Sequence, residues 1–211
     1  MITYLKLKGN KMNTRKFGTK IAKKESSFMI PFLRHFKPWE NDESLPQTVR
    51  DTSTPVILVL ERWDGRQGFI GGFNEPNDTI EKTIVKECLE ETNNVIQESD
   101  LKPVITHEFS IVTHSMSMEF NSFNELLKFA ENIRNSKHYM NEILGYSILY
   151  VGDLGRGKGL TQILKKNMAT SCREELVHLL VQENLVTIDT IKKSCEEAGF
   201  IFEEIYKDTE C

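Results

Sequence analysis

The order of apolar and polar residues along the chain predicts several strands. The run PVILVLE, 55–61, is continuously apolar and rich in β-branched residues, as expected of a strand that is buried on both faces. Shorter apolar patterns predict further strands at 28–34, 68–73, 103–113 and 142–151, and the 68–73 strand carries a Gly pair. The stretch 36–54 is polar and contains Pro38 and Pro46, which predicts a loop.

Other stretches have helical periodicity. In 79–92, Ile80, Ile84 and Cys88 recur every four residues, and Asp78 or Thr79 is a suitable N-cap. Further helices are predicted at 121–139, near 160–182 and at 187–198. Because strands and helices do not simply alternate, the sequence favours an α+β fold with a mixed sheet sandwiched between helices.

Length and charge predict one domain with additional ends. The 211 residues suit a single domain at 25–200, preceded by an arm at 1–24 and followed by a tail at 201–211. The net charge is −4, so no overall basic field indicates nucleic acid, and DNA is not an expected partner. The first 24 residues nevertheless carry eight Lys or Arg and no acidic residue. This arm is either a solvated, flexible leader or a contact for RNA phosphates.

The four cysteines are scattered, with neither a CxxC pair nor zinc spacing, which suits a reducing compartment. No apolar run reaches the length of a membrane span, and no secretory signal is visible. We therefore expect an intracellular protein without a membrane partner.

The candidate chemistry lies on the helix at 79–92. Glu87, Glu90 and Glu91 are spaced i, i+3 and i+4, which places three carboxylates on one face, where they repel one another. A hard divalent cation such as Mg²⁺ would relieve this repulsion, whereas a solvated acidic face is the alternative interpretation. Gly71 and Gly72 precede the helix after a strand, and glycines there allow the backbone to approach a ligand closely.

The segment from Gly72 to Asn93 resembles the Nudix box. Its spacing is intact and Glu87, Glu90 and Glu91 match, but Asp78 replaces Glu, Lys86 replaces Arg and Asn93 replaces the closing Gly. Asn tolerates a left-handed helix end, so Asn93 can close the helix. In the family the Arg orients the helix carboxylates, and Lys lacks the planar fork for that role, so Lys86 predicts a looser site.

The resemblance narrows to the branch that decaps small nucleolar RNA and also hydrolyses inosine diphosphates. It rests on RWDGRQGFIGGF at 62–73, EILG at 142–145, KGL at 158–160 and ATSCREEL at 169–176, and covers about residues 55–182. That branch holds the purine with a His on its first strand. His35 is the nearest candidate here, but the register through 28–54 is open.

The resemblance implies a set of site residues. Glu87, Glu90, Glu91 and the backbone of Gly71 would bind Mg²⁺ or Mn²⁺, and catalysis would use Glu87, Glu90, Glu91 and Glu175. The substrate would contact Arg62, Phe69, Gly71, Gly72 and Lys158. The Gly-rich loop 152–159 nearly matches a phosphate-binding Walker A loop, but Gly159 stands where Ser or Thr must bind Mg²⁺.

The expected activity is metal-dependent cleavage of a phosphoanhydride bond. The substrate would be an RNA 5′ cap or a purine nucleoside diphosphate such as (deoxy)inosine diphosphate, and the protein could form a homodimer. The alternative is a catalytically inactive Nudix-fold protein that binds RNA or acts as a scaffold.

Overall fold

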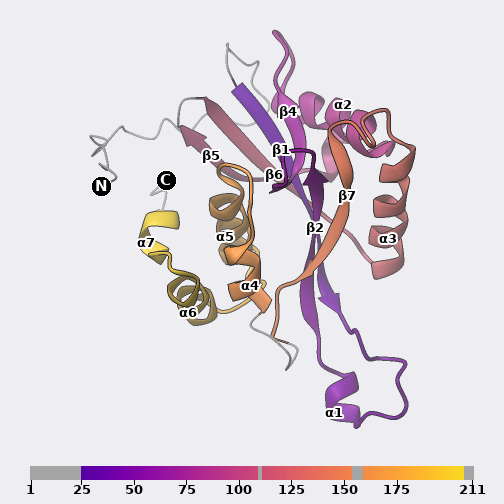
Figure 1. Ribbon diagram of the computed structural model, residues 1–211, viewed down its shortest axis with the longest axis vertical. Coiled ribbons are helices and arrows are strands. Elements are labelled where there is room, and N and C mark those ends of the chain that lie inside the picture. Colours follow the sequence, from indigo (N-terminus) through magenta and orange to yellow (C-terminus); the bar gives the residue numbers. More distant parts are fainter. Residues whose placement is uncertain (1–24, 109–110, 154–158, 207–211) are drawn as a thin grey trace.

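A seven-stranded mixed sheet lies between two groups of helices in the computed structural model (Figure 1), which describes residues 25–108, 111–153 and 159–206. The expected α+β architecture is therefore confirmed. The basic arm 1–24 and Lys158 lie outside the described residues.

The first strand, β1, organises the sheet. The strands are β1 (Glu25–Phe36), β2 (Thr54–Arg62), β3 (Gln67–Gly68), β4 (Ile70–Phe73), β5 (Lys102–Glu108), β6 (Val112–Glu119) and β7 (Ile143–Tyr150). The order is β3-β2-β1-β6-β5, with β4 also paired to β1 and β7 to β2. β1 and β6 run parallel, whereas the other pairs are antiparallel. β4 therefore lies beside the first half of β1 and β2 beside the second half.

The alternation along β2 shows why the sheet needs helices on both faces. Val56, Leu58 and Leu60 enter one apolar core, and Ile57 and Val59 enter the other. All five are buried, as the continuously apolar run predicts.

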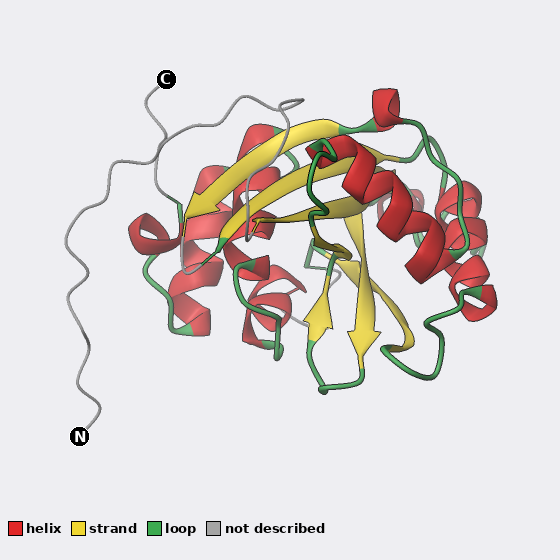
Figure 2. Cartoon of the chain, turned by 90° about the horizontal axis from the view of Figure 1, so that it is seen from above, coloured by secondary structure: helices red, strands yellow, loops and turns green. Residues whose placement is uncertain are grey.

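The helices divide between these two cores (Figure 2). The helices are α1 (Gln47–Arg50), α2 (Ile80–Thr92), α3 (Phe123–Glu131), α4 (Gly159–Lys165), α5 (Cys172–Gln182), α6 (Ile188–Ala198) and α7 (Phe202–Ile205), with 3₁₀ turns at Glu98–Asp100 and Asn132–Asn135. α2 and α3 cover one face and α4 to α7 the other, while α1 lies in the projecting β1–β2 connection (Figure 1). Within the described ranges, no helix has both the length and the apolarity to cross a membrane.

Two predicted elements were wrong in their extent. The single strand expected at 103–113 is the antiparallel pair β5 and β6. β6 escaped prediction because Thr113, Ser115 and Ser117 occupy buried positions where an apolar residue was expected. The helix expected at 121–139 ends at Glu131 and continues as a 3₁₀ turn.

The C-terminal half also departs from the prediction. Phe202 and Ile205 of α7, within the segment expected as a tail, pack into the core. The stretch near 160–182 is two helices, because the backbone between them pairs with β3 through Gln67. Arg173 donates to the carbonyls of Leu164 and Lys166, which close the end of α4. This break directs residues 169–172 toward the sheet.

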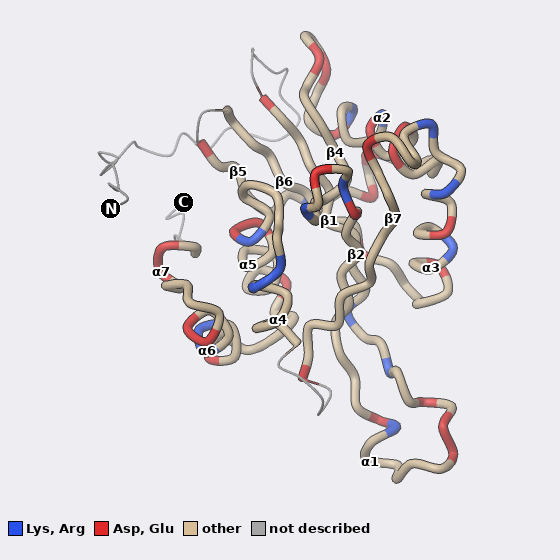
Figure 3. Tube along the Cα trace, viewed as in Figure 1, with Lys and Arg blue, Asp and Glu red and all other residues tan. Residues whose placement is uncertain are grey.

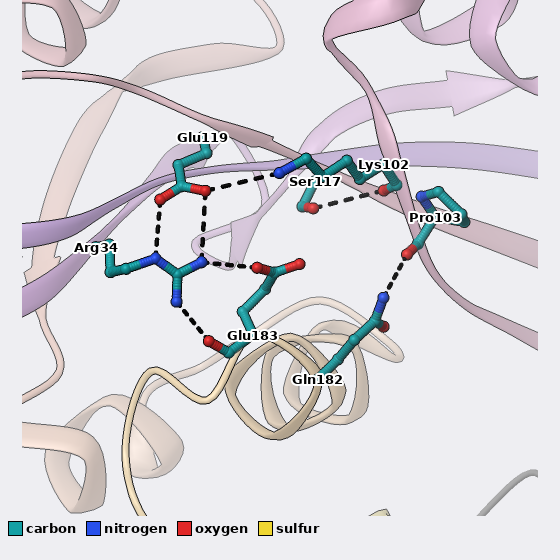
Figure 4. A network of polar contacts seen from close by, with 7 residues as sticks. All are labelled: Arg34, Lys102, Pro103, Ser117, Glu119, Gln182 and Glu183. Atoms are coloured by element: carbon teal, nitrogen blue, oxygen red, sulfur yellow. Dashed lines mark hydrogen bonds and ion pairs between the residues drawn. The ribbon is translucent and has the colours of Figure 1, made fainter.

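A polar clamp fixes the end of α5 to the sheet (Figure 4). Arg34 of β1 donates through Nε to Glu119 Oε1 of β6 at 3.0 Å, and through a terminal nitrogen to Glu183 Oε2 at 2.7 Å. Gln182 Nε2 donates to the Pro103 carbonyl of β5 at 2.9 Å. Two strands, β1 and β5, therefore contact the end of α5 directly, and Glu119 of β6 holds the Arg34 side chain between them.

Candidate active site

A cavity of about 630 Å³ opens between β4, the β2–β3 turn and the start of α5. α2 contributes Glu87 and Glu91 to its wall, and Glu142 lies just before β7. Acidic and basic positions lie close together around α2 and the β2–β3 turn (Figure 3). The other lining residues are Ser26, Phe28, Arg62, Arg66, Gly68, Phe69, Gly71, Gly72, Phe73, Ile111, Thr113 and the segment 169–172.

The two glycines of β4 make room for the groups around them. At Gly71, with φ +146°, a Cβ would lie 2.1 Å from the Ser27 carbonyl oxygen and 2.9 Å from the Phe28 ring. At Gly72 a Cβ would lie 2.5 Å from Glu87 Oε1. A side chain at either position would collide with these neighbouring groups, and glycine avoids that collision.

Capping and packing hold α2 in place. The hydroxyl of Thr79 accepts from the Lys82 N–H, so Thr79 is the N-cap. Asn93 has a left-handed conformation, φ 56°, and its N–H donates to the Leu89 carbonyl, which closes the helix as its sequence position predicts. Ile80, Ile84 and Cys88 are fully buried.

Glu91 is the most constrained carboxylate of the site. Its side chain is only 8% exposed, and Oε2 accepts the Gly71 N–H at 2.8 Å. Burial raises the pKa of Glu91 to about 8, against the effect of the Gly71 hydrogen bond, and the Glu87 carboxylate raises it further. Burial also raises the pKa of Glu87, with added repulsion from Glu90 and Glu142. Burial and mutual repulsion therefore disfavour the charged forms of Glu87 and Glu91 when no cation is bound.

Glu90 faces away from the cavity. Its Oε2 lies 2.8 Å from Lys137 Nζ and 3.6 Å from His138 Nε2, and the Lys137 contact lowers the pKa of Glu90. Across the described ranges, no three acidic, His or Cys side chains are gathered closely enough to hold a metal ion. The three helix carboxylates are thus adjacent along α2, but only Glu87 and Glu91 line the cavity.

The contact between Glu90 and Lys137 gives a first prediction. If Glu90 serves as a metal ligand, Lys137 must release it, so Lys137→Ala should lower the Mn²⁺ concentration for half-maximal activity several-fold. The measurement is turnover against Mn²⁺ concentration. Lys128→Ala, on α3, is the control for removal of a positive charge. An unchanged metal requirement in both variants would show that Glu90 has no part in metal binding.

Lys86 does not contact the helix carboxylates that the resemblance implied. Its Nζ lies 2.5 Å from Asp78 Oδ2 and 2.8 Å from Glu75 Oε2, and Lys82 Nζ lies 2.6 Å from Asp78 Oδ1. The Lys82 and Lys86 contacts lower the pKa of Asp78, and the Asp78 and Glu75 contacts raise that of Lys86. Two of the residues that depart from the Nudix box, Asp78 and Lys86, are therefore partners.

The pairing predicts a compensating exchange. Lys86→Arg alone should crowd the short Asp78 side chain and lower thermal stability slightly, because Arg is longer and branched at its end. The double variant that adds Asp78→Glu should differ from the sum of the two single variants by a coupling energy of roughly 0.5–3 kcal/mol, as expected for two residues in contact. Unfolding in denaturant of the two single variants and the double variant measures this coupling. Strict additivity would contradict the pairing.

The other expected site residues divide into two groups. Arg62 and Phe69 line the cavity, and Phe69 also belongs to the core, with 2% exposure. Glu175 is fully buried behind the wall, where its Oε1 accepts from Ser171 Oγ at 2.6 Å. Burial raises the pKa of Glu175 to about 7. His35 lies outside the cavity, exposed, with Nδ1 3.4 Å from Ser53 Oγ.

Several lining residues were not among the expected ones. Glu142 lies in the EILG segment, which the resemblance had already marked, so that signal was available. Ser26 and Phe28, not His35, are the side chains of β1 that reach the cavity, and Thr113 joins them from β6. No motif marked these three residues, because only the register between β1, β4 and β6 brings them together.

A mixed sheet between helices, with a carboxylate-bearing helix beside a Gly-Gly edge strand, is the arrangement of a Nudix hydrolase. The family described as Nudt16-like, U8 snoRNA-decapping enzyme-like, matches residues 43–186, more than half of the chain. The chain belongs to this family.

The solved structures that resemble the chain include three Nudix proteins. A MutT/nudix family protein from Listeria innocua is 15% identical, with 80% of this chain and 100% of that chain covered and a TM-score of 0.49. The NUDIX domain of Shewanella oneidensis NrtR, complexed with ADP ribose, is 13% identical, with 79% and 90% covered and a TM-score of 0.48. For a MutT/nudix family protein from Enterococcus faecalis the identity is 12%, the coverage 64% and 47%, and the TM-score 0.42. No curated protein sequence is significantly similar to this chain.

Proposed function

We propose that the protein hydrolyses a phosphoanhydride bond in a purine nucleoside diphosphate or at a capped RNA 5′ end, with Mg²⁺ or Mn²⁺ as cofactor. The observation that supports this most is that one cavity combines the Glu87, Glu91 and Glu142 carboxylates with the cations Arg62 and Arg66. The carboxylates suit a metal and the guanidinium groups suit phosphate.

The residues present fit a hard divalent cation. The donors are oxygens, and the raised pKa values of Glu87 and Glu91 show that their negative charges are poorly compensated by the protein alone. Glu87, Glu91 and Glu142 line the cavity and would supply oxygen donors, with the Gly71 carbonyl and with Glu90 after its release from Lys137. Their side chains would have to move together on metal binding, because no three such groups of the described residues lie close enough to hold an ion as they stand. The bound metal would polarise the phosphoryl oxygens and lower the pKa of water.

The protein's own groups would then carry out three tasks. Arg62 and Arg66 bind the phosphates, and Phe28 and Phe69 provide apolar walls for the base. Glu91 accepts a proton from the attacking water as oxygen bonds to phosphorus and the P–O anhydride bond breaks. A nucleoside diphosphate would give a nucleoside monophosphate and phosphate, and a capped RNA would give a 5′-phosphorylated RNA and the released cap nucleotide. Glu175, behind the wall, would act through Ser171, which lines the cavity and donates to its carboxylate.

The test is incubation with inosine diphosphate and Mn²⁺, followed by measurement of phosphate and inosine monophosphate. Equal amounts of the two products, lost in Glu91→Gln, are expected. A capped RNA in parallel gives the ratio of kcat/KM values between the two substrates. Tight binding of either substrate without turnover at any Mg²⁺ or Mn²⁺ concentration would instead favour the inactive binding protein.

A further inference from the structure

Two hydroxyl groups lie side by side in the strand wall of the cavity. Ser26 of β1 and Thr113 of β6 are register partners on parallel strands, and their side-chain oxygens are 3.1 Å apart. They are 2% and 4% exposed, yet both line the cavity. The apolar side chains of Phe28, Phe69 and Ile111 line the same cavity.

The contact between these hydroxyls leaves hydrogen-bonding capacity unused. Two hydroxyls carry two O–H donors, and the bond between them uses only one. Among the described residues, the pair therefore keeps one O–H donor and several lone pairs for another molecule. Buried polar groups are costly unless they are hydrogen-bonded, which points to a ligand atom or water as the partner of the remaining donor.

The position of the pair relates it to the proposed chemistry. Phe28 follows Ser26 by two residues on the same face of β1, and Phe28 is the register partner of Gly71, whose N–H binds Glu91. Ser26 is therefore the next residue after Phe28 on this face of β1, in the direction of the N-terminus and away from the part of β1 that pairs with β2. A planar ligand against Phe28 would turn an edge toward the hydroxyls.

We propose that Ser26 and Thr113 bind the edge of the substrate's nucleobase. The inference rests on the proposed function for the identity of the ligand as a nucleotide. The pair offers one donor beside one acceptor, and because either hydroxyl can be the donor, it fits any base edge that carries an N–H group next to an acceptor. Hypoxanthine, with N1–H beside O6, has such an edge. A purine without a substituent at C6 has only an acceptor there.

Binding of products tests this without any requirement for turnover. Inosine 5′-monophosphate and ribose 5-phosphate, which lacks the base, are titrated calorimetrically in the presence of Mg²⁺. Ser26→Ala and Thr113→Val should each weaken inosine monophosphate binding roughly tenfold, because a base group loses its partner. Ribose 5-phosphate binding should be unchanged. Thr113→Ser keeps a hydroxyl and should restore binding of the base.

Two controls keep the result specific. Ser117→Ala removes another buried hydroxyl from the same face of β6, one that binds the Lys102 carbonyl outside the cavity, and should leave both affinities unchanged. With the unaltered protein, purine riboside 5′-monophosphate should bind roughly tenfold more weakly than inosine monophosphate. This second comparison needs no variant to fold.

The outcomes separate the inference from the proposed function. Equal weakening of both ligands in Ser26→Ala and Thr113→Val, or no weakening of either, would overturn the role in base binding. If Ser26→Ala and Thr113→Val weaken binding of inosine monophosphate alone, and the unaltered protein hydrolyses no nucleotide, the base site is supported and the proposed hydrolase activity is contradicted. If both variants hydrolyse inosine diphosphate with the KM of the unaltered protein, the hydrolase activity is supported and the base site is contradicted.

Discussion

Glu91→Gln should lower turnover of a nucleoside diphosphate by two orders of magnitude or more, with the fold intact. The amide is nearly the same size and its oxygen can still accept the Gly71 N–H, so the hydrogen bond at 2.8 Å is retained. The substitution removes both a negative charge for the metal and the proposed proton acceptor, and a positioned general base alone contributes roughly 10²–10⁴-fold. The measurement is kcat at saturating Mn²⁺.

The same substitution should change how stability depends on pH. The pKa of Glu91 is about 8 in the folded protein against an ordinary 4.5, so folding favours the protonated form. Its stabilising contribution is complete below about pH 4.5 and is lost as the pH rises through 8. Without metal, Glu91→Gln should therefore be more stable than the unaltered protein at pH 9, by roughly 3–5 kcal/mol, and the difference should shrink toward pH 5.

Glu131→Gln, at an exposed position on α3, is the matched control and should change neither turnover nor the pH profile. Stability is measured by urea unfolding in a chelator at several pH values. Full turnover in Glu91→Gln would show that Glu91 of α2 takes no part in the reaction. A stability difference that is constant with pH would show that Glu91 is charged in the folded protein.

The sequence predicted the elements that have a simple period better than those that do not. β2 and α2 were found nearly at their observed bounds because each has an uninterrupted apolar pattern. β6 was missed because hydroxyl-bearing residues fill one buried face, so burial and hydropathy disagree there. The break between α4 and α5 depends on pairing of residues 167–169 with Gln67, a contact about a hundred residues distant in the chain.

For the candidate active site too, the sequence predicted local spacing but not the contacts between distant segments. Helical spacing placed Glu87, Glu90 and Glu91 on one face, but the spacing could not show that Lys137 would draw Glu90 away from the cavity. Lys86 was expected near the helix carboxylates, and only the fold of the loop before α2 shows that Asp78 is its partner. Ser26 and Thr113 meet through a parallel pairing of strands although they are 87 residues apart in the chain, and one sequence carries no local signal for such a pairing.

The second large effect is expected at Gly72. A methyl group there would lie 2.5 Å from Oε1 and 2.8 Å from Cδ of Glu87, and would force the carboxylate out of its position. The end of a Glu side chain moves at little cost, and φ at Gly72 does not lie in the left-handed region, so the fold should tolerate Gly72→Ala. We expect a loss of turnover as large as that of Glu87→Gln, roughly 10²-fold, with the melting temperature nearly unchanged.

A double variant and substitutions of two other glycines make this prediction specific. If Gly72→Ala acts only by displacing Glu87, the variant Gly72→Ala, Glu87→Gln should be no less active than either single variant. Gly145→Ala, where a Cβ meets nothing within 4 Å, is the control and should retain full activity. Gly71→Ala should instead destabilise the fold, because its Cβ would meet the Ser27 carbonyl at 2.1 Å in a backbone conformation, φ +146°, that suits only glycine. Additive losses in the double variant would show that Gly72 serves the reaction by some route other than the position of Glu87.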